Sequence, residues 1–215
     1  THFGSWKKGT PSLAQLKKPS PLDRKMVQLI EKDLTQSTIV LGHTGVSRIN
    51  PDYHAITVMN YILGAGGFSS RLMDSIRDKQ GLAYGIMSQF DSRVMPGAFF
   101  ISLPTRTDVT NQAITSVLAE IKTIREAPVT DQELSEAKSF IVGSFPLRID
   151  SSAKLANVLA QVELYNLGLD YFTSYPKAIE KVTKDDVLRV AKQYLDPQHY
   201  ALVVVGSIAK AKVKQ

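Results

Sequence analysis

The sequence predicts an α+β fold in which helices pack on a mostly antiparallel or mixed sheet. Two observations point to this class. First, strand-like and helix-like periodicities follow one another in the order ββααββαααβ, so that helices come in runs. Second, the strand-like runs 82–90 and 98–105 flank a short connection with Met95, Pro96 and Gly97, which is typical of an antiparallel pair. The composition, 43% hydrophobic and 21% charged over 215 residues, is that of a folded globular chain.

The N-terminal segment 1–22 is predicted to be a linker, and residues 23–215 to form one domain. The segment holds three prolines, two glycines and four lysines without a sustained period. It begins with the aromatic patch FGSW, which has no neighbouring apolar segment to pack on. We therefore expect that Thr1 is not the natural start of a domain and that another segment precedes it.

The first half of the domain is predicted to hold two strands and two helices. The runs 24–32 and 37–43 are strand-like, which is consistent with a hairpin or two neighbouring strands. A helix is expected over 51–63, with Gly64 placed to end it. A short second helix is expected from Ser69 or Ser70 to Lys79, with Gly81 as its stop.

The second half is predicted to be mostly helical. An amphipathic helix begins after Asp108 and ends before Pro128, and Thr130 with Glu133 forms a capping box for the next. Asp150 or Ser151 opens a further helix, which Gly168 terminates. A small extra helix fits near Pro176; Thr183 with Asp186 starts the last helix, and 199–206 returns as a buried strand.

The charge distribution leaves a nucleic-acid hypothesis open as the third choice. The formal net charge is +6, and the basic excess lies largely at the two ends. The residues concerned are Lys7, Lys8, Lys17, Lys18, Arg24, Lys25, Lys210, Lys212 and Lys214. No aromatic residues interleave with them, and no nucleic-acid motif accompanies them. Solvated tails are the favoured interpretation.

Several other classes of function have no support in the sequence. No apolar run is long enough for a membrane span, and Thr1 opens no signal-peptide pattern. The absence of cysteine excludes disulfides, thiol nucleophiles and cysteine metal sites. The histidines are scattered, with no H-x-x-E-H or H-E-x-x-H, so no metal site is expected in this chain. GAGG at 64–67 follows a helix, whereas a dinucleotide fingerprint must follow a strand.

Arg77 and Tyr84, seven residues apart, are the strongest candidates for chemistry. Arg77 is expected in the last helical turn and Tyr84 on the strand after the Gly81 turn, so that both overlook one cleft. A guanidinium offers fixed donors to a peptide carbonyl or carboxylate, and a phenol offers one directional donor to a developing oxyanion. The structural alternative is an arginine that caps helix carbonyls and an ordinary strand tyrosine.

The stretch GAGGFSSRLMDSIRDKQGLAYG resembles the signature of the C-terminal half of pitrilysin/insulinase-family zinc metallopeptidases, such as bacterial proteases similar to mitochondrial processing peptidase. LGHTGVSRINPDYHAITVMNYILG and ALVVVG extend the resemblance along the chain. It implies a processing-peptidase type of fold, in which two homologous halves close around an unfolded peptide. By resemblance, Arg77 and Tyr84 are the catalytic and substrate-binding pair, with Gly81 as a further substrate-binding position.

The resemblance also implies what this chain lacks. It has no H-x-x-E-H, so zinc is expected in a homologous half, in the same polypeptide upstream or in a partner subunit of a homo- or heterodimer. Residues 1–22 then correspond to the tail of that half and the linker. The chain alone is not expected to be active, and a catalytically inactive scaffold or partner subunit is the alternative function. A bacterial periplasmic or exported location is slightly favoured over the cytoplasm.

Overall fold

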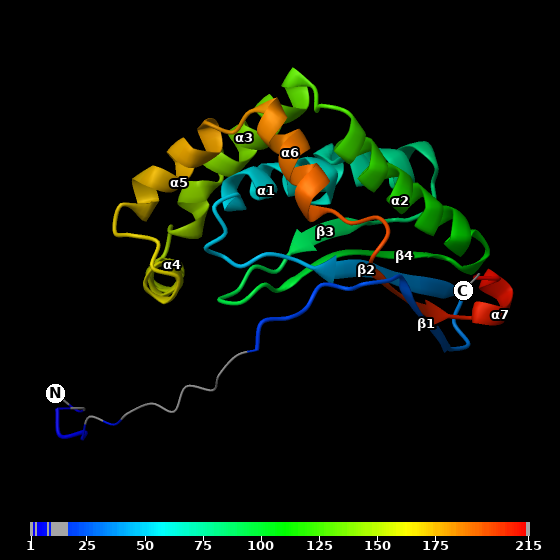
Figure 1. The fold of residues 1–215 in the computed structure, drawn as a ribbon, viewed down its shortest axis with the longest axis horizontal. Coiled ribbons are helices and arrows are strands. Elements are labelled where there is room, and N and C mark those ends of the chain that lie inside the picture. The colour runs from blue at the N-terminus through cyan, green and yellow to red at the C-terminus, as the bar shows by residue number, and fades with distance from the viewer. Residues whose placement is uncertain (1, 3, 8, 10–16, 214–215) are drawn as a thin grey trace.

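The computed structural model describes residues 2, 4–7, 9 and 17–213, in which helices cover one face of a five-stranded mixed sheet (Figure 1). This arrangement confirms the α+β class. The strands are β1 (Met26–Glu31), β2 (Gln36–Thr44), β3 (Met87–Phe90), β4 (Ala98–Arg106) and β5 (Ala201–Gly206). The longer helices are α1 (Tyr53–Asn60), α2 (Thr110–Glu126), α3 (Asp131–Gly143), α4 (Ser152–Leu164), α5 (Tyr171–Glu180) and α6 (Lys184–Tyr194).

The strand order is β1-β5-β2-β4-β3. The predicted antiparallel pairing of β3 with β4 is confirmed. The prediction that the first two strands are neighbours is wrong, because β5 lies between them, parallel to β1 and antiparallel to β2. A local pattern cannot reveal this insertion, since β5 is separated from both strands by most of the chain.

The core lies between the sheet and the helices. Alternate residues of each central strand point toward the helices and are buried, as the side-chain period of two requires. They include Ile39, Leu41, Phe99, Ile101, Leu103, Leu202 and Val204. Their neighbours along the strands, such as Val40, Phe100 and Val203, are half-buried on the opposite face.

The first helix differs from its predicted end. After α1 the chain continues as a π-helical turn, η1 (Tyr61–Ala65), and passes through Gly64. A Cβ atom at Gly64 would lie 2.6 Å from Ser88 Oγ and 2.8 Å from Ser88 N. Gly64 is therefore needed for the close approach of η1 to β3, and it does not end the helix.

The C-terminal helices follow their predicted caps. Both boxes form, with Thr130 bonded to Glu133 and Thr183 to Asp186, and Ser151 caps α4. The predicted stop at Gly168 is wrong by one turn, because α4 ends at Leu164 and Gly168 (φ +86°) belongs to the connection with α5. The expected small helix near Pro176 is α5, whereas the sequence pattern does not predict the short helix α7 (Ile208–Ala211).

The predicted linker 1–22 and the domain boundary after it stay predictions. Residues 1, 3, 8 and 10–16 lie outside the described residues, including part of the FGSW patch. Beyond them, the Ser20 carbonyl accepts a hydrogen bond from the Thr44 hydroxyl at 3.2 Å. No helix within the described ranges is long and apolar enough to cross a membrane.

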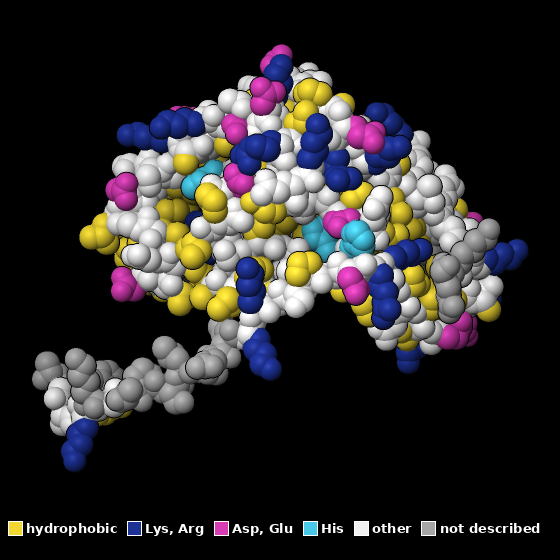
Figure 2. Space-filling view, viewed as in Figure 1, with side chains coloured by type: hydrophobic (Ala, Val, Ile, Leu, Met, Phe, Trp, Pro, Cys, Tyr) yellow, Lys and Arg dark blue, Asp and Glu magenta, His cyan; other side chains and the backbone are white. Residues whose placement is uncertain are grey.

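The basic residues do not gather on the face shown in Figure 2, where Lys and Arg side chains are interspersed with Asp and Glu over the helices. Of the basic ends, Lys8 and Lys214 lie outside the described residues. The face in view therefore lacks the single-sign patch that is typical of nucleic-acid binding.

Candidate functional site

The short helix that carries Arg77 ends in a glycine-dependent turn. This helix is η3 (Met73–Lys79), and Gly81 follows it with φ +61°. The Gly81 N–H donates to the Arg77 carbonyl at 3.0 Å, and the Leu82 N–H donates to the Ile76 carbonyl at 2.9 Å. The first bond, from the residue after the helix end to the carbonyl four residues earlier, is that of an αL C-cap, in which the left-handed residue is usually glycine. The predicted stop at Gly81 and the place of Arg77 in the last turn are both confirmed.

The predicted place of Tyr84 on a strand is wrong. The strand begins only at Met87, and Tyr84 lies in an irregular segment before it. Leu82 and Ala83 are buried, and the Thr105 hydroxyl donates to the Leu82 carbonyl at 2.6 Å. A side-chain hydrogen bond thus holds the segment to β4 in place of a strand ladder. An apolar run in the sequence looks the same in both cases, so it cannot distinguish them.

The structure nevertheless brings Arg77 and Tyr84 together. The Arg77 guanidinium carbon lies 5.5 Å from the centre of the Tyr84 ring and 4.7 Å from that of Phe68. Both rings are exposed, at 88% for Tyr84 and 71% for Phe68. A guanidinium within about 6 Å of an aromatic face is attracted to it. Phe68 is not among the residues that the sequence predicts for the site, although its position directly after two glycines is typical of an aromatic side chain on a turn.

Arg77 and Tyr84 line an open cavity of about 580 Å³. Its wall consists of Gln36, Arg77, Gly81, Leu82, Ala83, Tyr84, Pro104, Thr105 and Arg106. The charged members are both arginines. Arg77 pairs with Asp78 at 3.2 Å and Arg106 with Asp108 at 3.4 Å, but both pairs are solvent-exposed and therefore weak. The cavity thus offers cationic donors to a carbonyl or carboxylate group.

A bidentate ion pair fixes the start of the Arg77 segment. Arg71 Nε and Nη2 donate to the two carboxylate oxygens of Glu133 at 2.6 and 2.9 Å. Burial would raise the pKa of Glu133, but the hydrogen bonds from Arg71 and from the Thr130 N–H outweigh it and hold this pKa below its usual range. Arg71 stands two residues before η3, so the charged pair joins the start of this helical segment to the first turn of α3. It therefore positions the helix on which Arg77 lies.

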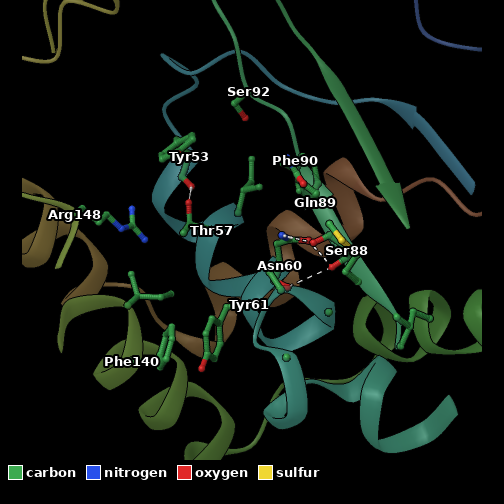
Figure 3. Close-up of a pocket in the computed structure, with 17 residues that line it drawn as sticks. Tyr53, Thr57, Asn60, Tyr61, Ser88, Gln89, Phe90, Ser92, Phe140 and Arg148 are labelled. Atoms are coloured by element: carbon green, nitrogen blue, oxygen red, sulfur yellow. Dashed lines mark hydrogen bonds between the residues drawn. The ribbon is translucent and has the colours of Figure 1, made fainter. Parts of the chain in front are cut away.

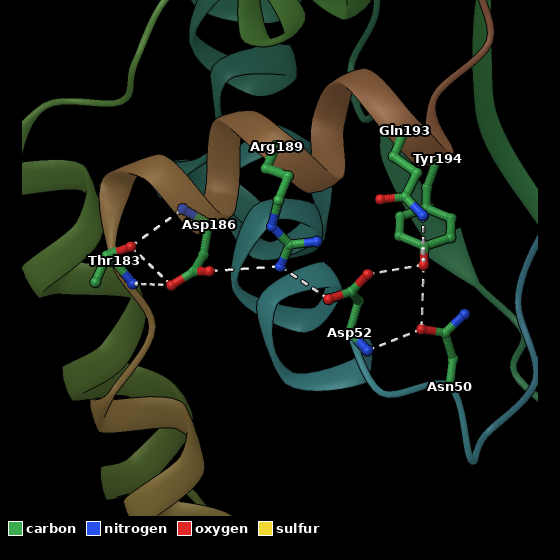
Figure 4. Close-up of polar contacts among 7 residues, drawn as sticks. All are labelled: Asn50, Asp52, Thr183, Asp186, Arg189, Gln193 and Tyr194. Atoms are coloured by element: carbon green, nitrogen blue, oxygen red, sulfur yellow. Dashed lines mark hydrogen bonds and ion pairs between the residues drawn. The ribbon is translucent and has the colours of Figure 1, made fainter.

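A second polar cluster joins α6 to the start of α1 (Figure 4). Arg189 donates to Asp52 at 2.8 Å, and the Tyr194 hydroxyl donates to the other Asp52 oxygen at 2.8 Å. The hydrogen bond from Arg189 is the main reason that the pKa of Asp52 is lowered. The charged groups of this cluster find their partners within the protein, and we assign the cluster to helix packing.

The described residues do not fit a zinc site. No group of three His, Asp or Glu side chains within them could hold a metal ion. His43 uses both ring nitrogens, with Nδ1 bonded to the Thr44 carbonyl and Nε2 to the Asp196 N–H. His199 Nδ1 lies 2.8 Å from Asp196 Oδ2. These two side chains alone do not make a zinc site, because zinc takes at least three protein ligands.

Comparisons with known proteins identify the family of this chain. The model of the Peptidase M16 inactive domain family matches residues 1–141. The non-peptidase homolog YmxG of Helicobacter pylori is 28% identical over 193 residues, which cover 88% of this chain and 44% of that protein. An uncharacterized zinc protease of Streptomyces coelicolor is 30% identical over 185 residues, or 85% of this chain and 39% of that one. The chain thus spans less than half the length of these relatives.

A solved structure has the same fold. The peptidase M16 inactive domain from Pseudomonas fluorescens superposes with a TM-score of 0.85 at 30% identity, over 92% of this chain and 47% of that chain. The family match covers well over half of the sequence and includes the stretch that holds Arg77 and Tyr84. The chain therefore belongs to the Peptidase M16 inactive domain family.

Proposed function

We propose that this chain is the non-zinc-binding half of a zinc metalloendopeptidase, in which Arg77 and Tyr84 contact the main chain of an unfolded peptide substrate. The observation that carries the proposal is the pair of half-buried Arg77 and exposed Tyr84 at one open cavity. The Tyr84 hydroxyl makes no hydrogen bond within the described part of the chain, and its ring is 88% exposed. A purely structural role leaves such exposure without a reason.

The two side chains suit different parts of a peptide. The planar guanidinium of Arg77, which lies near the rings of Phe68 and Tyr84, presents its donors to a substrate carbonyl. The Tyr84 phenol provides one directional donor where negative charge develops on the carbonyl oxygen. Gly81 has open space where a Cβ would lie, so a substrate backbone can approach the turn closely.

The catalytic metal is proposed to come from outside this chain, since no group of three His, Asp or Glu side chains among the described residues could hold it. Under the proposal, zinc is held by a homologous half with H-x-x-E-H, in the same polypeptide or in a partner subunit. When bound there, zinc supplies the activated water and polarises the scissile carbonyl. This chain's own residues bind and orient the peptide.

The role of Arg77 is tested with an unstructured quenched peptide and the full-length protein. Arg77→Ala removes a contact to the substrate backbone, so we expect KM to rise and kcat/KM to fall about 10²-fold. Lys79→Ala is the matched control, since Lys79 lies on the same helix, is exposed and pairs with Asp74. Equal kcat/KM for the two variants, at equal melting temperature, would remove Arg77 from the site.

A scaffold function is the second candidate, because the similar Helicobacter pylori protein is named a non-peptidase homolog. A scaffold retains the fold without needing the Arg77 and Tyr84 side chains. The full-length protein would then be inert toward unstructured peptides even with zinc and a candidate partner present. Substitution of either side chain would leave assembly with the partner unchanged.

A further inference from the structure

A second cavity, of about 500 Å³, lies between α1 and the edge strand β3 (Figure 3). It shares no lining residue with the Arg77 cavity. Four aromatic side chains line it, namely Tyr53, Tyr61, Phe90 and Phe140. Asn60 and Ser88 are buried in its wall and bond to each other, with the Ser88 hydroxyl donating to Asn60 Oδ1 at 2.7 Å. The cavity is thus largely apolar, with a few fixed polar groups, as ligand sites usually are.

One stretch of the strand edge beside this cavity is unpaired. The Asp91 N–H donates to the Ala98 carbonyl, so by the alternation of an antiparallel ladder the main-chain groups of Phe90 point away from β4. Outside the β3–β4 ladder, neither the N–H nor the carbonyl of Phe90 has a hydrogen-bond partner among the described residues. At Ser88 the edge is closed, because Asn60 Nδ2 donates to the Ser88 carbonyl and Gly64 packs on the Ser88 nitrogen.

The charge at the cavity has one sign. Among the described residues, Arg148 is the only charged one that lines it, and Figure 3 shows the guanidinium directed toward the cavity. Arg148 makes no ion pair with any described carboxylate and lies 5.8 Å from the Tyr175 ring. The Ser92 hydroxyl, also in the wall, is buried without a hydrogen-bond partner among the described residues. A buried hydroxyl without a partner is costly, and a ligand with polar groups would satisfy it.

From these observations we propose that the cavity binds an extended peptide segment, which pairs with Phe90, inserts a large apolar side chain among the four aromatic rings and directs a carboxylate to Arg148. Main-chain pairing at a free strand edge supplies affinity, and the cavity supplies selectivity. The carboxylate can come from an acidic side chain or from a peptide C-terminus. The inference concerns binding alone and does not depend on cleavage at Arg77 and Tyr84.

The test uses the full-length protein, EDTA to prevent turnover, and a fluorescein-labelled octapeptide with a central phenylalanine flanked by alternating valine and threonine and followed by one glutamate. We expect binding by anisotropy, and about a tenfold loss of affinity in Arg148→Gln, equivalent to one charged contact of roughly 1.4 kcal/mol. Ala65→Trp, on an exposed alanine of the cavity rim, should block binding. Arg24→Gln, an exposed arginine away from the cavity, is the matched control.

Peptide variants separate the contributions. Alternate N-methylation should abolish binding, because it removes the donors that pair with Phe90. Replacing the glutamate by glutamine, or amidating the C-terminus, shows which carboxylate meets Arg148. Wild-type affinity in both Arg148→Gln and Ala65→Trp, no loss on N-methylation, or no binding at millimolar peptide would each overturn the inference.

Discussion

Gly81 is the residue on which the geometry of the Arg77 site depends most directly. Its φ of +61° turns the chain so that the Arg77 guanidinium on the helix and the Tyr84 ring after it lie within 5.5 Å. An L-residue in this left-handed conformation is strained by about 1–2 kcal/mol. The seven-residue spacing therefore brings the two side chains together only because a glycine occupies the turn.

Gly81→Ala is expected to destabilise the protein by roughly 1 kcal/mol. The backbone strain of alanine at this φ is partly offset, because alanine also lowers the conformational entropy of the unfolded chain. Gly85→Ala is the control, because Gly85 also has open space where a Cβ would lie but has no positive φ. We expect it to be neutral or slightly stabilising. The melting temperatures of the two variants check this, and an equal effect at both positions would contradict the role of the Gly81 turn.

At the scale of elements, the ion pair between Arg71 and Glu133 anchors η3 to α3. The pKa of Glu133 is lowered in the folded state, so the pair contributes stability above the unfolded pKa of about 4.3 and loses it as the pH falls through the folded value. Glu133→Gln should therefore lower the free energy of unfolding at pH 7 by about 1 kcal/mol, a value reduced for partial exposure.

The difference between wild type and Glu133→Gln should shrink as the pH is lowered to about 3, where the Glu133 carboxylate becomes increasingly protonated and its charge is lost. Thermal unfolding of both proteins, followed by circular dichroism at pH 7 and pH 3, measures this difference in stability. A difference of the same size at both values would show that the carboxylate charge contributes nothing.

The elements that the sequence predicts correctly are those that local bonds determine. The caps at Thr130, Ser151 and Thr183, and the stop at Gly81, depend on residues within a few positions of each other. Pairings between distant segments are out of reach, as with β5 between β1 and β2. The irregular segment at Tyr84 has the apolar pattern of a strand because Leu82 and Ala83 are buried. The Thr105 hydroxyl holds it to β4, and this distant contact leaves no local pattern.

For the candidate site, the sequence identifies Arg77, Gly81 and Tyr84 but not Phe68 and Arg106. Phe68 contacts Arg77 across a turn whose shape depends on Gly67, which has φ +58°. Arg106 comes from the end of β4, and only the fold brings it to the same cavity. Neither contact corresponds to a residue spacing that a sequence pattern could reveal.

At the scale of the whole molecule, the chain spans less than half of its relatives and lacks metal-binding groups within its described residues. The Arg77 cavity is open and cationic, and its exposed tyrosine hydroxyl has no partner in the described structure. Under the proposed function, a second half brings zinc to the peptide while this half contacts the same peptide at Arg77 and Tyr84.

The most direct test of this account is zinc-dependent cleavage of an unstructured quenched peptide by the full-length protein, comparing wild type with Tyr84→Phe. The change removes one hydroxyl from an exposed ring, so the melting temperature should not change. If Tyr84 donates to the developing oxyanion, kcat should fall about 10²-fold or more. Equal turnover by wild type and Tyr84→Phe would contradict the central claim.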